Sequence, residues 1–105
     1  MTEILNVKEW VAYQQGAIVS KTLVEKETGT VTLFAFDKDQ ALSEHTAPFD
    51  ALVQITDGRA EIRIAGEPHP VGAGEMLIMP ANKSHALKAI TPFKMMLTMI
   101  RAENK

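Results

Sequence analysis

Apolar and polar residues alternate with a period of two along most of this chain. Successive side chains of an extended strand point to opposite faces, so this period is typical of strands with one buried face. The alternating runs are short and end at glycine, proline or aspartate clusters. Many short strands separated by turns predict a single all-β domain, 1–105, built as an antiparallel sandwich or barrel. The clearest runs lie at 31–36, 51–55, 60–64 and 94–100.

Two departures from plain alternation carry local information. Asp57-Gly58 lies between two alternating runs and predicts a tight hairpin, because glycine adopts positive φ without strain. Only the first fifteen residues suggest a helix, with Asn6 as its N-cap and Val7, Trp10 and Val11 on one side. We therefore expect at most one short helix, at the N-terminus.

Two strand-like segments, 76–79 and 95–100, are apolar on both faces. A strand that is wet on one side should alternate with polar residues, so the outer face of these segments must be covered. In a chain of 105 residues a second copy is the available cover, and we expect a twofold homodimer. The five methionines of these segments are interpreted as packing residues rather than a soft-metal site.

Composition excludes several classes of function. The formal net charge is −2 and neither sign forms a run, which argues against nucleic acid as a partner. The absence of cysteine excludes disulfides, thiolate metal sites and cysteine nucleophiles. No basic leader precedes an apolar stretch, and no window approaches the roughly 20 apolar residues of a membrane span. We expect a cytoplasmic protein with no membrane partner.

The strongest candidate chemistry lies in His45 and His85, which flank apolar segments far apart in the chain. Imidazole is the commonest neutral metal ligand and a proton carrier near neutral pH. The third histidine, His69, stands between two prolines in a predicted turn and is interpreted as solvent-facing. No glycine-rich phosphate loop, nucleophile elbow or catalytic carboxylate pair accompanies them.

The segment 42–89 resembles the two signature motifs of the cupin superfamily, which are small antiparallel jelly-roll barrels. The first family motif reads His-x-His, three or four residues, Glu, six residues, Gly; His45-x-Ala47, Ala51 and Gly58 keep its spacing. The second reads Gly, five residues, Pro-x-Gly, two residues, His, three residues, Asn. Its spacing is kept by Gly74, Pro80-x-Asn82, His85 and Ala89.

The departures from these motifs bear on function. In the family, two histidines and the glutamate of the first motif hold one divalent metal together with the histidine of the second. Here alanine replaces the second histidine, the glutamate and the asparagine, at Ala47, Ala51 and Ala89. A methyl group cannot coordinate a metal. The resemblance therefore implies that His45 and His85 remain as two ligands of four, a weak shell for iron, manganese, nickel or zinc.

A neighbouring side chain offers a third ligand only under one condition. Positions 45, 47, 49 and 51 share a strand face, so Asp50 should point away from the interior. A bulge near Pro48 would turn Asp50 inward and give the two-histidine, one-carboxylate set that suits non-haem iron. Without such a bulge, Asp50 is a solvated or turn-capping residue.

Three functions remain open. The alanines leave space as well as removing ligands, which favours a small protein that binds an organic acid or carbonyl compound in a roomy interior pocket. The second candidate is a metal-dependent isomerase or dioxygenase, by analogy with cupins that hold a metal, in which Asp50 or waters complete the shell of His45 and His85. The third is a structural dimerisation module. The pocket of the first candidate is expected to be lined by His45, Ala47, Ala51, Val53, Ile55, His85 and Leu87.

Overall fold

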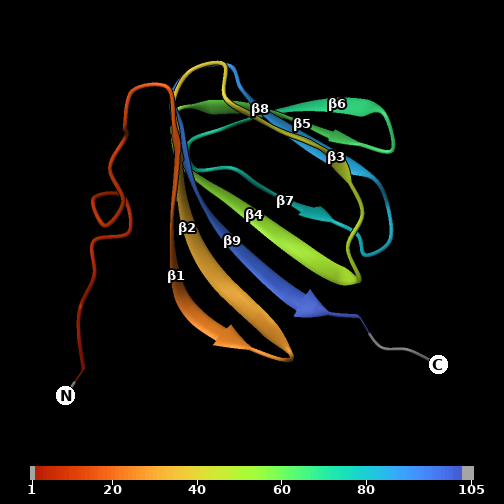
Figure 1. Cartoon of the computed structure of the whole chain (residues 1–105), viewed down its shortest axis with the longest axis horizontal. Coiled ribbons are helices and arrows are strands. Elements are labelled where there is room, and N and C mark those ends of the chain that lie inside the picture. Colours follow the sequence, from red (N-terminus) through yellow and green to blue (C-terminus); the bar gives the residue numbers. More distant parts are fainter. Residues whose placement is uncertain (1, 103–105) are drawn as a thin grey trace.

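Antiparallel strands make up the regular structure of the computed structural model, which describes residues 2–102 (Figure 1). No helix occurs in that part of the chain. The all-β prediction is confirmed, and each of the four clearest alternating runs lies inside one strand. The strands are β1 (Ile18–Lys26), β2 (Gly29–Phe36), β3 (Ala41–His45), β4 (Phe49–Asp57), β5 (Arg59–Ile64), β6 (Glu67–Gly72), β7 (Met76–Met79), β8 (His85–Ala89) and β9 (Phe93–Arg101).

Two sheets face each other. The five-stranded sheet has the order β1-β2-β9-β4-β7 and the four-stranded sheet the order β3-β8-β5-β6. Every strand pair within them is antiparallel. Strands close in sequence, such as β3 and β4, lie in different sheets, and this crossing gives the predicted jelly-roll barrel. The sheets splay apart towards the right in Figure 1, where β3 ends and β8 begins.

The core lies between the sheets and follows the alternation of the sequence. In β4 every second residue, Ala51, Val53 and Ile55, is buried, and their neighbours are half-exposed or exposed. The rings of Phe36 and Phe93 stack in the core with centroids 4.5 Å apart. Twelve buried residues form one continuous cluster there: Phe36, Ala51, Val53, Ile55, Ala60, Ile62, Val71, Met79, Leu87, Ala89, Phe93 and Met95.

The hairpin predicted at Asp57-Gly58 is wrong, because β4 and β5 belong to different sheets and do not pair with each other. Gly58 instead forms the corner where the chain crosses between sheets, with φ of 73°. A Cβ at this position would lie 1.9 Å from the carbonyl oxygen of Pro92. The corner therefore requires glycine both for its backbone conformation and for the close approach of the β8–β9 loop.

The N-terminal helix is also wrong. The chain makes one turn, in which Trp10 N–H donates to the Asn6 carbonyl and the Asn6 side chain accepts from Lys8 N–H. One turn gains too few hydrogen bonds to offset the cost of helix nucleation. Instead, Val11 packs at 4% exposure onto the outer face of the five-stranded sheet, against Leu33 and Ala35. The N-terminal segment thus covers part of the outer sheet face that a second copy was expected to cover.

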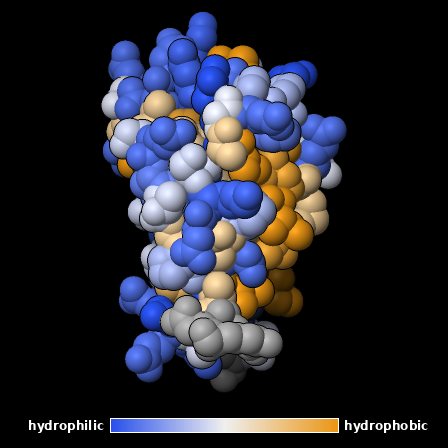
Figure 2. Space-filling model, turned by 90° about the vertical axis from the view of Figure 1, so that its right-hand side faces the viewer, coloured by the Kyte–Doolittle hydropathy of each residue, from blue (hydrophilic) through white to orange (hydrophobic). Residues whose placement is uncertain are grey.

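The remaining outer face stays open. Ile78 is 55% exposed and Ile100 is 53% exposed, on strands β7 and β9 of the five-stranded sheet. Figure 2 shows a band of hydrophobic residues along one flank of the molecule. Whether a second copy covers this face remains a prediction. Within residues 2–102, no helix has the length and hydropathy needed to cross a membrane.

Candidate functional site

The structure brings His45 and His85 together. His45 ends β3 and His85 begins β8, and the two residues are register partners in the four-stranded sheet. Their Nε2 atoms are 3.1 Å apart and their ring centroids 4.4 Å apart, with the rings nearly perpendicular. β3 ends and β8 begins on the side where the two sheets splay apart (Figure 1). The site is therefore a pair of imidazoles at the mouth of the barrel.

A β-bulge places His45 on the correct face. Leu42 pairs with Leu87 and His45 pairs with His85, so two residues of β3, Ser43 and Glu44, face a single residue of β8. Strict alternation from Leu42 would have turned His45 to the outside of the sheet. The extra residue shifts the strand by one position, and this shift brings His45 over His85.

Hydrogen bonds determine which nitrogens carry protons. His45 Nδ1 lies 2.8 Å from the Ser43 carbonyl oxygen, which can only accept, so Nδ1 of a neutral His45 carries the proton. His45 Nε2 then has a lone pair, and the proton between the rings belongs to His85 Nε2. This assignment leaves Nδ1 of His85 as an acceptor, and that atom is buried with no hydrogen-bond partner in the described residues.

The two rings differ in their contact with water. His85 is only 6% exposed, whereas His45 is exposed. Burial lowers the pKa of His85 below its ordinary 6.5, and the neighbouring His45 lowers it further; the Lys83 backbone acts weakly in the opposite sense. A buried imidazolium is poorly solvated, so His85 is neutral at pH 7. In this pair His85 is the buried, neutral hydrogen-bond donor, and His45 is the ring that contacts solvent.

The interior behind the pair is filled rather than open. The exposed fractions are 2% for Ala51, 0% for Val53, 2% for Ile55 and 3% for Leu87, so these four residues are almost completely buried. These four residues were expected to line a roomy pocket, but they pack against the aromatic and methionine side chains of the core. Ala47 is half-buried near the surface, and its carbonyl accepts from Asn82 N–H at 2.9 Å. Any ligand of the histidines would thus bind at the mouth.

Asp50 lies apart from the histidines. It is exposed, and its Oδ1 accepts a hydrogen bond of 2.9 Å from Ala81 N–H, so it caps the turn after β7. This is the outward orientation that strand parity gives, and the bulge that occurs lies in β3 rather than near Pro48. In residues 2–102, no three histidine, aspartate or glutamate side chains are grouped closely enough to hold a metal ion.

His69 does not lie in a turn. It is part of β6, an edge strand of the four-stranded sheet, where it pairs with Ile62 and is half-buried. The flanking Pro68 and Pro70 are tolerated because an edge strand needs no hydrogen-bond donors on its open side. His69 takes no part in the histidine pair, although it is similar to His45 in chemistry.

No sequence pattern points to the Ser43 carbonyl, which fixes the orientation of His45. A backbone carbonyl is common to every residue, and only the bulge brings this one within reach of Nδ1. A register shift of this kind depends on how two distant strands pair, so no local pattern in β3 reveals it.

Comparison with known proteins identifies similar chains. A family profile described as Cupin domain matches residues 32–101. A crystal structure of a conserved protein of unknown function from Streptococcus pyogenes is 36% identical with a TM-score of 0.93, covering 99% of this chain and 91% of that chain. A cupin 2 conserved barrel domain protein from Leptotrichia buccalis is 41% identical with a TM-score of 0.90, covering 92% of this chain and 47% of that one. No match was found among curated proteins.

Proposed function

The chain belongs to the cupin domain family, and on this premise we propose that it binds a small organic acid or carbonyl compound at its histidine pair. The observation that carries the proposal is that the Nε2 atoms of the two histidines lie 3.1 Å apart. One of these atoms belongs to the buried ring of His85 and the other to the exposed ring of His45. A ligand oxygen that approaches the mouth of the barrel meets both rings at their polar edges. Small-molecule sites use such a few convergent polar groups beside apolar walls.

The protonation state of the pair determines which ligand it holds. In the neutral pair a single N–H lies between the rings, and it can be donated to a carbonyl oxygen in place of His45. When the pair takes up one proton, it offers two Nε2–H donors to a carboxylate and carries a compensating charge. Binding of a carboxylate should therefore strengthen as the pH falls and the pair takes up this proton.

Calorimetric titration with a panel of small carboxylic acids and carbonyl compounds tests this proposal. We expect at least one compound to bind wild-type protein, more tightly at pH 5.5 than at 7.5 if it is an acid. The variants His45→Gln and His85→Gln should lose this binding. His69→Gln is the matched control, because it removes a histidine of the same sheet outside the pair. Binding that survives both substitutions in the pair would refute the proposal.

The same 3.1 Å distance supports a second candidate, a metal-dependent cupin enzyme. Two nitrogens bound to one ion at 2.0–2.1 Å lie about 2.8–3.4 Å apart at tetrahedral or octahedral angles. His45 and His85 thus fit two positions of a shell, and water or substrate would have to fill the others. A divalent ion at this place would polarise a substrate oxygen as a Lewis acid.

Elemental analysis of untagged protein separates the two candidates. Near-stoichiometric iron, manganese, nickel or zinc that disappears in His85→Gln favours the metal enzyme. Protein that contains no metal, and gains none on dialysis against these ions, favours metal-free binding. The calorimetric panel then shows whether the pair binds a ligand at all.

A further inference from the structure

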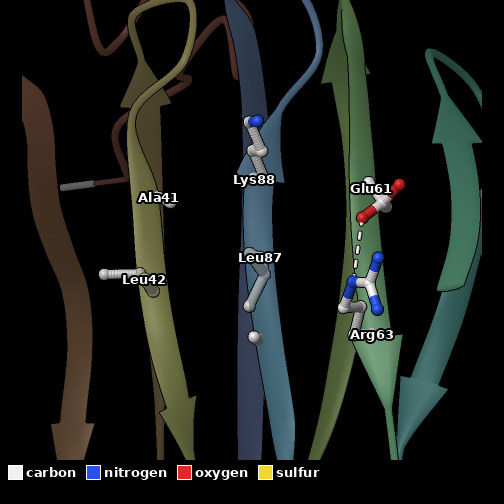
Figure 3. Close-up of a pocket in the computed structure, with 7 residues that line it drawn as sticks. Ala41, Leu42, Glu61, Arg63, Leu87 and Lys88 are labelled. Atoms are coloured by element: carbon white, nitrogen blue, oxygen red, sulfur yellow. Dashed lines mark hydrogen bonds and ion pairs between the residues drawn. The ribbon is translucent and has the colours of Figure 1, made fainter. Parts of the chain in front are cut away.

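A hollow lies on the outer face of the four-stranded sheet, on the side opposite the histidine pair. It measures about 260 Å³, somewhat below the range of about 300–1,000 Å³ that is usual for drug-sized ligands. Figure 3 shows the side chains around it, which come from β3, β8 and β5. The lining residues are Ala41, Leu42, Glu61, Arg63, Ala86, Leu87 and Lys88.

The hollow exists because small residues and the bulge coincide. Ala86 is the β8 residue opposite the bulge of β3, and it pairs with Arg63 on the other side. Ala41, across from Lys88, also has only a methyl group. The long side chains of Glu61 and Arg63 on β5 therefore stand beside the methyl groups of Ala41 and Ala86, which form the floor of the hollow. The bulge in β3 also interrupts the regular pairing between β3 and β8.

The charges around this floor are unbalanced. Arg63 Nε donates to Glu61 Oε2 at 3.0 Å (Figure 3), and among the described residues the two terminal nitrogens of the guanidinium have no hydrogen-bond partner. Lys88 is the register partner of Glu61, yet within residues 2–102 it forms no ion pair. The hollow is thus flanked by two positive charges, Arg63 and Lys88, and by one negative charge, Glu61, which is bound to Arg63.

We propose that this hollow is a binding site for a small organic oxyanion, a carboxylate or a phosphate ester. The free fork of Arg63 matches the two oxygens of such a group, and Lys88 adds a second positive charge. The short organic part of the ligand would lie on Ala41 and Ala86. Glu61 holds the guanidinium in place and disfavours larger polyanions, because its own charge repels them.

The site is independent of the proposed function, because it uses none of the residues of the histidine pair. Both sites nevertheless depend on the bulge of β3, which places His45 inside and opens the hollow outside. An experiment must therefore report on the two sites separately, which residue-resolved NMR can do.

The test is a ¹⁵N NMR titration of the full chain with malonate and, separately, with inorganic phosphate and phenyl phosphate. We expect saturable shifts of the amides of Arg63, Ala86 and Lys88, and a dissociation constant that rises with ionic strength. Loss of one exposed charge contact should weaken binding about fivefold in Lys88→Gln and in Arg63→Gln. The control Lys26→Gln makes the same charge change on the other sheet and should leave the dissociation constant unchanged.

Several results would overturn the proposal. Shifts that stay linear at the highest ligand concentration, or that weaken equally in the control variant, indicate general charge attraction without a site. Binding that is lost in His85→Gln but kept in Lys88→Gln belongs to the histidine pair and not to the hollow. Binding that survives His85→Gln supports the hollow even if the proposed function fails. Comparison of malonate with the two phosphates identifies which oxyanion the site prefers.

Discussion

The Tyr13 hydroxyl donates a hydrogen bond of 2.6 Å to Oδ2 of Asp57, which lies 44 residues further along the chain. Lys8 reaches the other oxygen of the same carboxylate at 3.6 Å, and Lys94 Nζ donates to the Lys8 carbonyl at 2.7 Å. The hydrogen bond from Tyr13 holds the pKa of Asp57 below its ordinary value. Burial, reinforced by Asp57, raises the pKa of the Tyr13 phenol. Asp57 thus fastens the N-terminal segment to the corner of the barrel.

Tyr13→Phe should weaken the attachment of the N-terminal segment to the barrel, because it removes the hydrogen bond to Asp57. The loss of a hydrogen bond to a partly exposed carboxylate should lower the free energy of unfolding by about 1 kcal/mol at pH 7. Because the folded-state pKa of Asp57 is lowered, the contribution is present above the unfolded value near 3.8 and is lost as the pH falls below it. Urea unfolding at pH 7 and at pH 3 measures both effects. A difference between the two proteins that does not shrink in acid would contradict the assignment.

Gly58→Ala should be strongly destabilising, because it combines a strained backbone with a clash. Its φ of 73° costs an alanine about 1–2 kcal/mol, and a Cβ at 1.9 Å from the Pro92 oxygen forces the β8–β9 loop to move at a further cost of about 1–3 kcal/mol. Gly66→Ala is the control, since φ is 84° there but no atom of the described residues lies within 4 Å of the added Cβ. Thermal unfolding of both variants separates strain from clash. Equal losses of stability would show that the close approach has no effect.

The sequence predicts those parts of this protein that depend on local alternation. The core positions of β4 and β9 follow the period of two, and the motif spacing identified the histidines that meet at the mouth. The hairpin at Gly58 was wrong because a glycine turn signals a reversal or a corner equally well, and only strand pairing distinguishes them. The filling of the expected interior pocket could not be foreseen for a similar reason. Space left by Ala51 is filled by core side chains from other strands, which no local pattern specifies.

The buried His85 should make the protein less stable in mild acid. Its folded-state pKa lies below 6.5, so the unfolded chain binds a proton that the folded chain excludes as the pH falls below that value. The free energy of unfolding should decline between pH 7.5 and 5.5, by no more than about 1.4 kcal/mol per pH unit from this group. In His85→Leu this slope should be smaller, and stability at pH 7.5 should be unchanged or higher because the unpartnered Nδ1 is gone. His69→Leu serves as the control. An unaltered slope in His85→Leu would assign the acid sensitivity elsewhere.

The open half of the five-stranded sheet should pair with a second copy. The N-terminal segment covers the outer face near Leu33 and Ala35, whereas Ile78 and Ile100 stay more than half exposed on β7 and β9. A twofold contact would bury this apolar face in both copies at once. Light scattering at micromolar concentration should therefore report a dimer, and Ile78→Lys should convert it to a monomer by placing a charge in the contact. Ile90→Lys, an exposed isoleucine in the β8–β9 loop, should leave the dimer intact. A wild-type protein that is monomeric under these conditions would exclude the pairing and leave the apolar face without a function.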